Sequence, residues 1–385
     1  MRIAIPKEIM AKERRVAATP ETVAKYRKLG HDVAVEAGAG AGVYADDAAY
    51  AAAGATIVAD VQALLRSADL VLKVKQPIFN AAVGKHEVDM LASNSTLVTF
   101  LHPASPDSHD MVRKLRDRGI TSFTMDGIPR ITRAQSMDAL TSMSTCTGYR
   151  AVLDAAKHLP RFVPMLATAI GTVRPAEVLV IGAGVVGLQA IATAKRLGAI
   201  TRAWDIRAAA RSDAASLGAQ VDGFSMPDNV ALGSGGYARA LDADWLQRER
   251  EALAPFLAKA DIVICSALVP GAVAPMLVTA SMVRSMKRGS VLVDVSIDQG
   301  GNCELTKAGE EILVQDVLIS GIQNIPGRMP VHATWLYAEN MYKFVENLLK
   351  RGGTPDLDDE IVASSLVTRG GKLHYKPALA VIGNT

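Results

Sequence analysis

Short apolar segments separated by polar or alanine-rich stretches run through the first 130 or so residues. The apolar segments are RIAIP (2–6), HDVAVEAG (31–38), ATIVA (55–59), DLVLKVK (69–75), STLVTF (95–100) and ITSFTM (120–125). Between them, PETVAKYRKLG (20–30) and DMVRKLRDRG (110–119) have the composition of helices. Strands that alternate with helices indicate a parallel sheet covered on both faces.

The same alternation returns in the second half of the chain. Its apolar segments are EVLVIGAG (177–184), AITRAWD (199–205), AQVDGF (219–224), DIVICSA (261–267), SVLVDVS (290–296) and VLISGI (317–322). Residues 133–159 contain no proline and predict one long helix or two, and residues 333–353 also look helical. We therefore expect an α/β fold with two Rossmann-like, doubly wound parallel-sheet domains, a cleft between them and long connecting helices.

The expected domain boundaries follow from this alternation. Residues 1–132 together with 331–385 would form a discontinuous N-terminal domain. Residues 133–330 would form the second domain, with its connecting helix. A cleft between two such domains is a usual place for ligands.

One predicted strand carries charge on an otherwise apolar pattern. In segment 67–77, apolar residues alternate with Val71, Lys73 and Lys75, so one face of the strand ends in two lysines. An unpaired ammonium group is costly to bury. We therefore expect Lys75, just before the Gln76-Pro77 break, to reach solvent or to meet an anion.

Composition excludes several classes of protein. Among 385 residues, 49% are hydrophobic, which is enough for ordinary cores. The 42 basic and 39 acidic residues form no basic block, so nucleic acid is not an expected partner. The three cysteines, Cys146, Cys265 and Cys303, form an odd set without metal-ligand spacing, and we expect neither a disulfide nor a bound metal. With no signal peptide and no run of about 18 apolar residues, a cytoplasmic location without direct membrane insertion is expected.

A glycine-rich motif opens the second domain. Gly182-x-Gly184-x-x-Gly187 follows an apolar strand and begins a helix, and Asp205 ends the next strand. The three glycines would allow a tight turn, close approach of a pyrophosphate and packing of the helix on the sheet, while Asp205 would accept hydrogen bonds from the adenosine ribose. This arrangement predicts a dinucleotide site that favours NAD over NADP, a preference that Arg207 weakens without reversing.

A second segment is expected near the same nucleotide. SALVPG (266–271) follows an apolar strand and would lie at the carboxyl edge of the sheet. Ala267 and Leu268 are therefore assigned to the cofactor site, near its nicotinamide half.

The sequence resembles a known family, which comprises alanine dehydrogenase and the NAD(H)-binding first domain of proton-translocating nicotinamide nucleotide transhydrogenase. The segments that carry the resemblance, which covers nearly the whole chain, are RIAIPKE, RRVAATPETV, VEAGAGAGVYADDAAYAAAGATIV, PRITRAQSMDALTSMS, VIGAGVVGLQAIATAKRLGA and QGGNCELT. Overall similarity leans to the transhydrogenase subunit. The resemblance implies that Arg130, Gln135 and Asp138 lie in a loop that touches the nicotinamide end and an NADP-carrying partner, and that Tyr237 lies in a mobile loop closing over the nucleotide.

Four other residues resemble the substrate site of alanine dehydrogenase. The resemblance implies substrate binding by Arg15 and Lys75 and catalysis by His102 and Asp298. Reductive amination of a 2-oxo acid needs a cation for the carboxylate and a proton donor, and these residues could supply both. Asp298 comes from the second domain, so closure of the cleft would complete the site. Taken singly, each residue also fits an ordinary structural role, such as a solvated lysine or a turn-capping aspartate.

Three functions are consistent with these residues. The first is an NAD-dependent amino-acid dehydrogenase, and the second is the soluble NAD(H)-binding alpha subunit of a transhydrogenase whose membrane and NADP-binding portions are separate chains. A regulatory nucleotide-binding protein is the third, and the intact four-residue set argues against it. We rank the dehydrogenase first, since a transhydrogenase subunit has no evident need for a proton-transferring histidine. The resemblance also implies a homo-oligomer, a dimer or larger, while the substrate side chain and the direction of reaction in the cell stay open.

Overall fold

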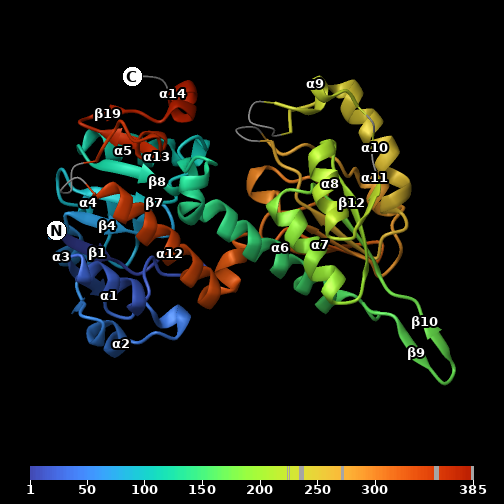
Figure 1. The fold of residues 1–385 in the computed structure, drawn as a ribbon, viewed down its shortest axis with the longest axis horizontal. Coiled ribbons are helices and arrows are strands. Elements are labelled where there is room, and N and C mark those ends of the chain that lie inside the picture. Colours follow the sequence, from blue (N-terminus) through green and yellow to red (C-terminus); the bar gives the residue numbers. More distant parts are fainter. Residues whose placement is uncertain (223, 225, 234–237, 270–272, 351–354, 383–385) are drawn as a thin grey trace. The chain divides into compact units, whose positions relative to one another are not determined.

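The chain divides into two compact units. The computed structural model describes residues 1–385 except 223, 225, 234–237, 270–272, 351–354 and 383–385. One unit comprises Met1–Met143 and Pro326–Thr385, and the other comprises Ser144–Ile325 (Figure 1). The expected boundaries, at 132/133 and 330/331, assign more of the connecting segments to the second domain than this division does.

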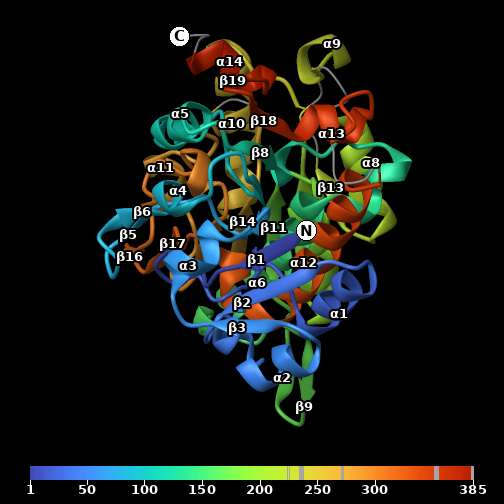
Figure 2. The same ribbon diagram turned by 90° about the vertical axis from the view of Figure 1, so that its left-hand side faces the viewer.

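An eight-stranded sheet forms the centre of the first unit. Its strands are β1 (Arg2–Ile5), β2 (Asp32–Glu36), β3 (Thr56–Val58), β4 (Leu70–Leu72), β7 (Thr96–Thr99), β8 (Thr121–Thr124), β18 (Leu366–Arg369) and β19 (Lys372–Leu373). The order is β19-β18-β8-β7-β4-β1-β2-β3, in which the six strands from β8 to β3 are parallel and β18 pairs antiparallel with β8. Figure 2, in which this unit faces the viewer, shows β1, β2 and β3 side by side. The carboxyl ends of β8, β7, β4 and β1 therefore meet at one edge of the sheet.

Helices cover both faces of this sheet. They are α1 (Pro20–Lys28), α2 (Asp47–Ala52), α3 (Val61–Arg66), α4 (Glu87–Met90), α5 (His109–Asp117), α12 (Pro330–Leu348), α13 (Glu360–Ser365) and α14 (Lys376–Ile382), with a short hairpin of β5 (Phe79–Asn80) and β6 (Lys85–His86). Helix α1 begins where the sequence supplies a start signal. Thr19 caps it through a reciprocal contact with Thr22, and Pro20 occupies the first turn, where its missing N–H costs nothing. Helix α12 confirms the helix expected after Pro330, and twelve of its side chains are buried.

A seven-stranded sheet forms the centre of the second unit. Its strands are β11 (Glu177–Ile181), β12 (Ile200–Trp204), β13 (Gln220–Asp222), β14 (Ile262–Cys265), β15 (Val291–Asp294), β16 (Glu311–Val314) and β17 (Val317–Ser320). The order is β13-β12-β11-β14-β15-β17-β16, parallel apart from β16. Two doubly wound parallel sheets confirm the expected fold class.

The second sheet is apolar on both faces, as a buried parallel sheet requires. The helices are α6 (Ala139–His158), which begins in the first unit, α7 (Val185–Arg196), α8 (Ala208–Ser216), α9 (Asp228–Ala231), α10 (Ala243–Leu257) and α11 (Ala280–Arg284). Val178 and Val180 of β11 pack with α6, α7 and α8, whereas Leu179 and Ile181 pack with α10 and α11 on the opposite face. Successive side chains of a strand point to opposite faces of the sheet, so alternate residues of β11 pack against different helices.

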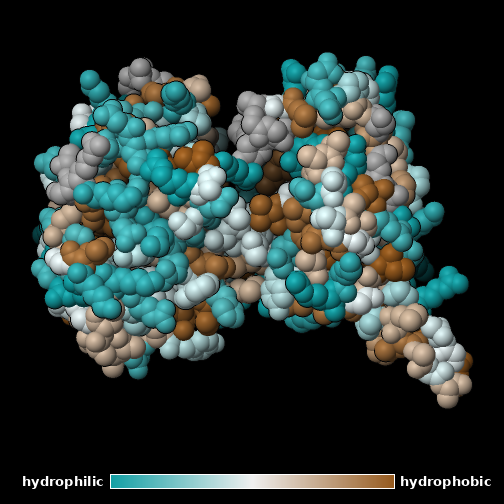
Figure 3. Space-filling model, in the orientation of Figure 1, coloured by the Kyte–Doolittle hydropathy of each residue, from teal (hydrophilic) through white to brown (hydrophobic). Residues whose placement is uncertain are grey.

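A hairpin projects from the second unit. It consists of β9 (Leu166–Thr168) and β10 (Gly171–Val173), and part of its surface is apolar (Figures 1 and 3). Ile170, between the two strands, is 99% exposed, and Met165, just before β9, is 62% exposed. Within the described residues, no helix combines the length and apolar character needed to cross a bilayer.

Candidate active site and nucleotide-binding loop

The glycine-rich turn between β11 and α7 has the geometry that a pyrophosphate needs. Gly182 lies at φ +90°, and a Cβ there would lie 2.7 Å from the backbone nitrogen of Ala267. At Gly187 an added Cβ would lie 1.9 Å from the carbonyl oxygen of Gly182, so the helix packs on the loop only with glycine there. Gly184 is the N-cap of α7, and an added Cβ would have no neighbour within 4 Å. The helix N-terminus and the open space at Gly184 together fit a phosphate group.

Asp205 lies directly after β12, beside this turn. It is 6% exposed, and its Oδ2 accepts the backbone N–H of Ala183 at 2.8 Å. The guanidinium of Arg207 binds both carboxylate oxygens, through Nε to Oδ1 at 3.0 Å and Nη2 to Oδ2 at 2.8 Å. The structure thus places Asp205 where the fingerprint requires an acid and adds a cation against it.

The segment after β14 is tied to the same turn. The hydroxyl of Ser266 donates to the carbonyl oxygen of Gly182 at 2.8 Å. Ala267 donates its N–H to Oδ1 of Asn302 at 3.0 Å, and its carbonyl accepts from Nδ2 of the same side chain at 2.8 Å. Leu268 is 37% exposed. The sequence alone did not assign Asn302 a role, and this fully buried amide helps to hold the segment in place.

Trp204, the residue before Asp205, is hydrogen-bonded to a buried acid, Glu249, that makes the stability of the chain depend on pH. Trp204 donates its indole N–H to Glu249 at 3.0 Å, and Glu249 is 4% exposed. Burial raises the pKa of Glu249 to about 7, although the bond from Trp204 opposes the rise. The folded chain therefore holds this proton up to about pH 7, whereas the unfolded chain releases it near the ordinary pKa of 4.5.

Replacement of Glu249 by glutamine is expected to remove part of the pH dependence of stability. In the wild-type chain, the free energy of unfolding should fall by about 3 kcal/mol between about pH 4.5 and 7 on account of this group. Glutamine keeps an acceptor for Trp204 and does not titrate, so E249Q should lack that fall. Urea unfolding across this pH range measures the difference, and parallel curves for the two proteins would contradict the assignment.

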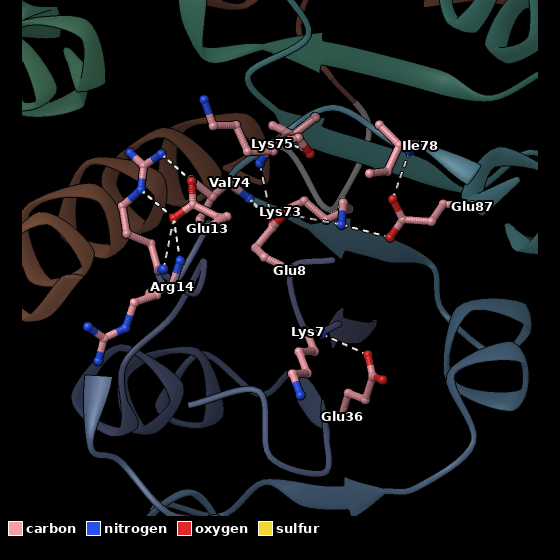
Figure 4. A network of polar contacts seen from close by, with 12 residues as sticks. Lys7, Glu8, Glu13, Arg14, Glu36, Lys73, Val74, Lys75, Ile78 and Glu87 are labelled. Carbon is pink, nitrogen blue, oxygen red and sulfur yellow. Dashed lines mark hydrogen bonds and ion pairs between the residues drawn. The ribbon is translucent and has the colours of Figure 1, made fainter. Parts of the chain in front are cut away.

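In the first unit, the two lysines of segment 67–77 have different surroundings (Figure 4). Strand β4 ends at Leu72, and Lys73 is only 2% exposed. Its Nζ lies 2.8 Å from Glu87 Oε1 and 3.4 Å from Glu8 Oε2, so the anions that Lys73 meets are two carboxylates of the protein. The two carboxylates raise the pKa of Lys73 against the opposing effect of burial. Lys75 is partly exposed and follows a turn that Glu8 holds, since Glu8 Oε1 accepts the N–H of Val74 at 2.6 Å.

Arg15 forms a bidentate ion pair with the carboxylate of Glu13. It is 3% exposed, and its Nε and Nη2 bind Glu13 Oε1 and Oε2 at 2.8 and 2.6 Å. Its Nη1 lies 2.9 Å from the sulfur of Met143. Burial works against ionisation of Glu13, but Arg15 and the nearby Lys75 lower its pKa to about 2. A substrate carboxylate would have to compete with Glu13 for the planar fork of Arg15.

His102 lies at the carboxyl end of β7 in a strained backbone conformation. Its φ is +46°, which is uncommon for a residue other than glycine. Asp126, after β8, holds this conformation by accepting the backbone N–H of His102 at 2.8 Å and contacting Nδ1 at 2.8 Å. Burial raises the pKa of Asp126, but the contacts with His102 and Thr124 lower it overall. The contact at Nδ1 favours the tautomer whose Nε2 accepts a proton, as a general base requires.

These groups of the first unit share one edge of the sheet. The hydroxyl of Thr99 donates to the carbonyl of Lys75 at 3.0 Å, which links the ends of β7 and β4. Phe100 stacks on the ring of His102 and also meets the ring of Tyr337 from α12. Tyr337 in turn donates to the carbonyl of Lys73 at 2.8 Å. The sequence alone did not identify Glu8, Glu13, Glu87 and Asp126. The partners of Glu8, Glu87 and Asp126 lie 65, 14 and 24 residues away, whereas Glu13 is only two residues from Arg15 and was overlooked.

Asp298 belongs to the second unit. It lies in a short 3-10 helix, η6 (Ile297–Gln299), after β15, is exposed, and accepts a hydrogen bond from Gln323 at 2.8 Å. Its approach to Arg15, Lys75 and His102 stays a prediction.

The loop with Arg130, Gln135 and Asp138 lies in the first unit around the 3-10 helix η4 (Thr132–Met137). Arg130 and Gln135 are exposed, and Asp138 caps α6 by accepting the N–H of Thr141 at 2.9 Å.

Two contacts hold this loop in place. Arg133 pairs with both oxygens of Asp359 at 2.7 and 3.0 Å, and Asn340 of α12 donates to the carbonyl of Ser136 at 2.8 Å. The loop is thus fastened to α12 and to the start of α13, so its exposed residues are presented from a fixed backbone. Tyr237, the proposed lid residue, lies outside the described residues.

Comparisons with known proteins cover nearly the whole chain. Residues 4–147 match the alanine dehydrogenase/PNT N-terminal domain, and residues 151–376 match the alanine dehydrogenase/PNT C-terminal domain. A chain of Rhodospirillum rubrum that forms the first portion of NAD(P) transhydrogenase subunit alpha is 43% identical, over 98% of this chain and 99% of its own length. The alanine dehydrogenase of Halomonas elongata is 35% identical, over 100% of this chain and 97% of its own. The solved transhydrogenase from Sinorhizobium meliloti superposes with a TM-score of 0.84 at 40% identity, covering 97% of this chain and 100% of that one. The chain belongs to the alanine dehydrogenase/PNT family.

Proposed function

We propose that this chain is the NAD(H)-binding alpha subunit of an NAD(P) transhydrogenase, which exchanges hydride between NAD(H) bound here and NADP(H) on a partner chain. The observation that carries the proposal is the 43% identity to the Rhodospirillum rubrum transhydrogenase alpha chain along nearly the full length of both proteins. Identity to alanine dehydrogenase is 35%. This difference reverses the order in which the sequence alone ranked the two activities, while an NAD-dependent oxidoreductase is common to both.

The residues of the second unit fit NAD(H), which supplies the hydride when bound. The turn at Gly182–Gly187 would hold the pyrophosphate at the start of α7, and Asp205 would bind the adenosine ribose. Ala267 and Leu268 follow β14 at the carboxyl edge of the sheet, where the nicotinamide half of a dinucleotide binds in such folds. Arg130, Gln135 and Asp138 of the first unit are proposed as further cofactor-binding residues.

The pairing of Arg15 with Glu13 also favours the transhydrogenase over the dehydrogenase. Both of its paired donors already bind Glu13, so the first unit is charge-balanced at this position without a substrate carboxylate. A transhydrogenase subunit needs no such carboxylate site, whereas a 2-oxo acid dehydrogenase does.

An amino-acid dehydrogenase is the second candidate, and the pairing of His102 with Asp126 favours it. A histidine that is oriented through Nδ1 by a carboxylate is suited to proton transfer at Nε2. Lys75 ends the neighbouring strand segment and could bind a substrate carboxylate.

One experiment with two arms separates the candidates. In the first arm, the purified chain is mixed with an NADP-binding transhydrogenase partner, NADH and the oxidised 3-acetylpyridine analogue of NADP, and reduction of the analogue is followed by absorbance. In the second arm, the chain is supplied with NADH, ammonium and a panel of 2-oxo acids. We expect rapid exchange in the first arm and none above background in the second; the opposite pattern would establish the dehydrogenase and overturn the proposal.

A further inference from the structure

The carboxylate assigned to the adenosine ribose has a full set of partners within the chain. Oδ1 of Asp205 accepts the backbone N–H of Arg207 at 2.9 Å and its Nε at 3.0 Å. Oδ2 accepts Nη2 of Arg207 and the backbone N–H of Ala183, each at 2.8 Å. An ionised carboxylate offers about four lone-pair positions, and these four bonds use them. A ribose hydroxyl can donate to Asp205 only if one of these donors leaves.

The four donors differ in their freedom to leave. The N–H of Ala183 belongs to the turn between β11 and α7, and the N–H of Arg207 belongs to the N-cap residue of α8. Both are held by backbone that the fold fixes. The guanidinium of Arg207 ends a flexible side chain that is 20% exposed, so it can rotate away without moving either helix.

We propose that Arg207 is an internal latch on the ribose subsite, closed on Asp205 before nucleotide binds and displaced by the ribose hydroxyls of NAD(H). This inference rests on the proposed binding of NAD(H) by the second unit. A binding site that is competent for only part of the time has its apparent affinity reduced by that fraction. If the latch is closed about 80–90% of the time, it weakens NADH binding about five- to tenfold.

The displaced guanidinium would have the opposite effect on a nucleotide with a 2′-phosphate. Arg207 follows Asp205 by two residues, so after displacement it stays beside the ribose. Its planar fork can bind a phosphate through two parallel hydrogen bonds, whereas the carboxylate of Asp205 repels that group. Arg207 therefore weakens binding of NADH and supports residual binding of NADPH, and its removal should sharpen discrimination between the two.

Arg211 provides a matched control on the same helix. Its Nη1 donates to the carbonyl oxygens of Asp205 and Ile206 at 2.8 and 2.9 Å and does not bind the Asp205 carboxylate in the described contacts. Arg211→Gln removes the same charge one turn further along α8. It is expected to weaken both nucleotides slightly, because both are anions, and to leave their ratio unchanged.

The test is a titration of the full chain with NADH and with NADPH, followed by nucleotide fluorescence, for the wild type, R207Q, R207K and R211Q. Circular dichroism establishes that each variant is folded. R207Q is expected to bind NADH about five- to tenfold more tightly and NADPH more weakly than the wild type. R207K keeps the charge without the planar fork, so it should tighten NADH binding by less and largely retain NADPH binding. If R207Q does not fold, R207K alone makes the comparison.

The outcomes separate the latch from the proposed function. Unchanged or weaker NADH binding in folded R207Q, or in R207K where R207Q does not fold, would overturn the latch alone. A parallel change for both nucleotides that R211Q reproduces would also overturn it, since that pattern reflects net charge. Failure of the wild-type chain to bind NADH would overturn the proposed function, and the latch with it.

Discussion

Substitution of Lys73 by methionine is expected to lower the free energy of unfolding of the first unit by about 3–5 kcal/mol near neutral pH. The ammonium group is 2% exposed and lies between the carboxylates of Glu8 and Glu87, at 3.4 and 2.8 Å. Methionine fills the space but leaves both buried carboxylates without their cation. Burial raises the pKa of Glu8 even with Lys73 present. Lys73 holds the pKa of Glu8 down against burial, so in K73M Glu8 should take up a proton more readily and the loss should be smaller at about pH 5.

Urea unfolding by circular dichroism measures this loss, and hydrogen exchange of β4 assigns it to the first unit. The matched control is the triple variant K73M/E8Q/E87Q. Each glutamine keeps an oxygen for the backbone N–H that the acid accepts, from Val74 or Ile78, while the buried charge is gone. The triple variant should regain most of the stability at every pH. A loss below about 1 kcal/mol in K73M, or one that does not change with pH, would show that the cluster is not a buried charged triad.

Replacement of Gly184 by alanine is expected to weaken NADH binding at least about 100-fold, or about 2.7 kcal/mol, without changing stability. An added Cβ meets nothing of the chain within 4 Å, so the fold has no reason to respond. The same methyl group would occupy the space that a bound pyrophosphate needs next to the backbone. Fluorescence titration with NADH measures the binding, and thermal unfolding measures the stability.

Gly187→Ala is the contrasting variant. There the added Cβ would lie 1.9 Å from the carbonyl of Gly182, so G187A should lose both binding and stability. Gly184 is thus expected to allow the ligand to approach the backbone, whereas Gly187 allows the helix to pack on the loop. Normal NADH affinity in G184A would mean that the pyrophosphate does not bind at this turn.

The parallel strands of both sheets could be predicted because each is a local apolar run with turn residues on either side. All twelve expected strands are present, from β1 to β17. The hairpin β9–β10 was missed because it is almost wholly exposed, so its residues carry no burial pattern. Strands β18 and β19 were missed for another reason. They follow α12 by a long interval in sequence, and β18 pairs with β8 some 240 residues earlier, a partner that no local periodicity reports.

The residues of the candidate site also fall into those that a local sequence pattern predicts and those that depend on distant contacts. The glycines and Asp205 lie within one strand-turn-helix-strand unit, so their spacing alone predicted the geometry of the turn. Strand periodicity identified Lys73 and Lys75 as unusual, but it could not tell that Lys73 is buried. That outcome depends on Glu8, which is 65 residues away in the sequence and reaches the lysine only in the folded sheet. Asp126, the partner of His102, is likewise 24 residues away. Glu13 is only two residues from Arg15, but nothing in the local pattern marked the two as a buried pair.

The division of the chain has a consequence for its synthesis. The second unit is complete once the ribosome has added Ile325, whereas the first unit still lacks α12 and the strands β18 and β19. Twelve buried side chains of α12 belong to that missing portion. We therefore expect the usual order, in which the N-terminal domain folds first as it emerges, to be inverted here. Until β18 is made, β8 would have one unpaired edge on the nascent polypeptide, so a chaperone is expected to matter most at this stage of translation.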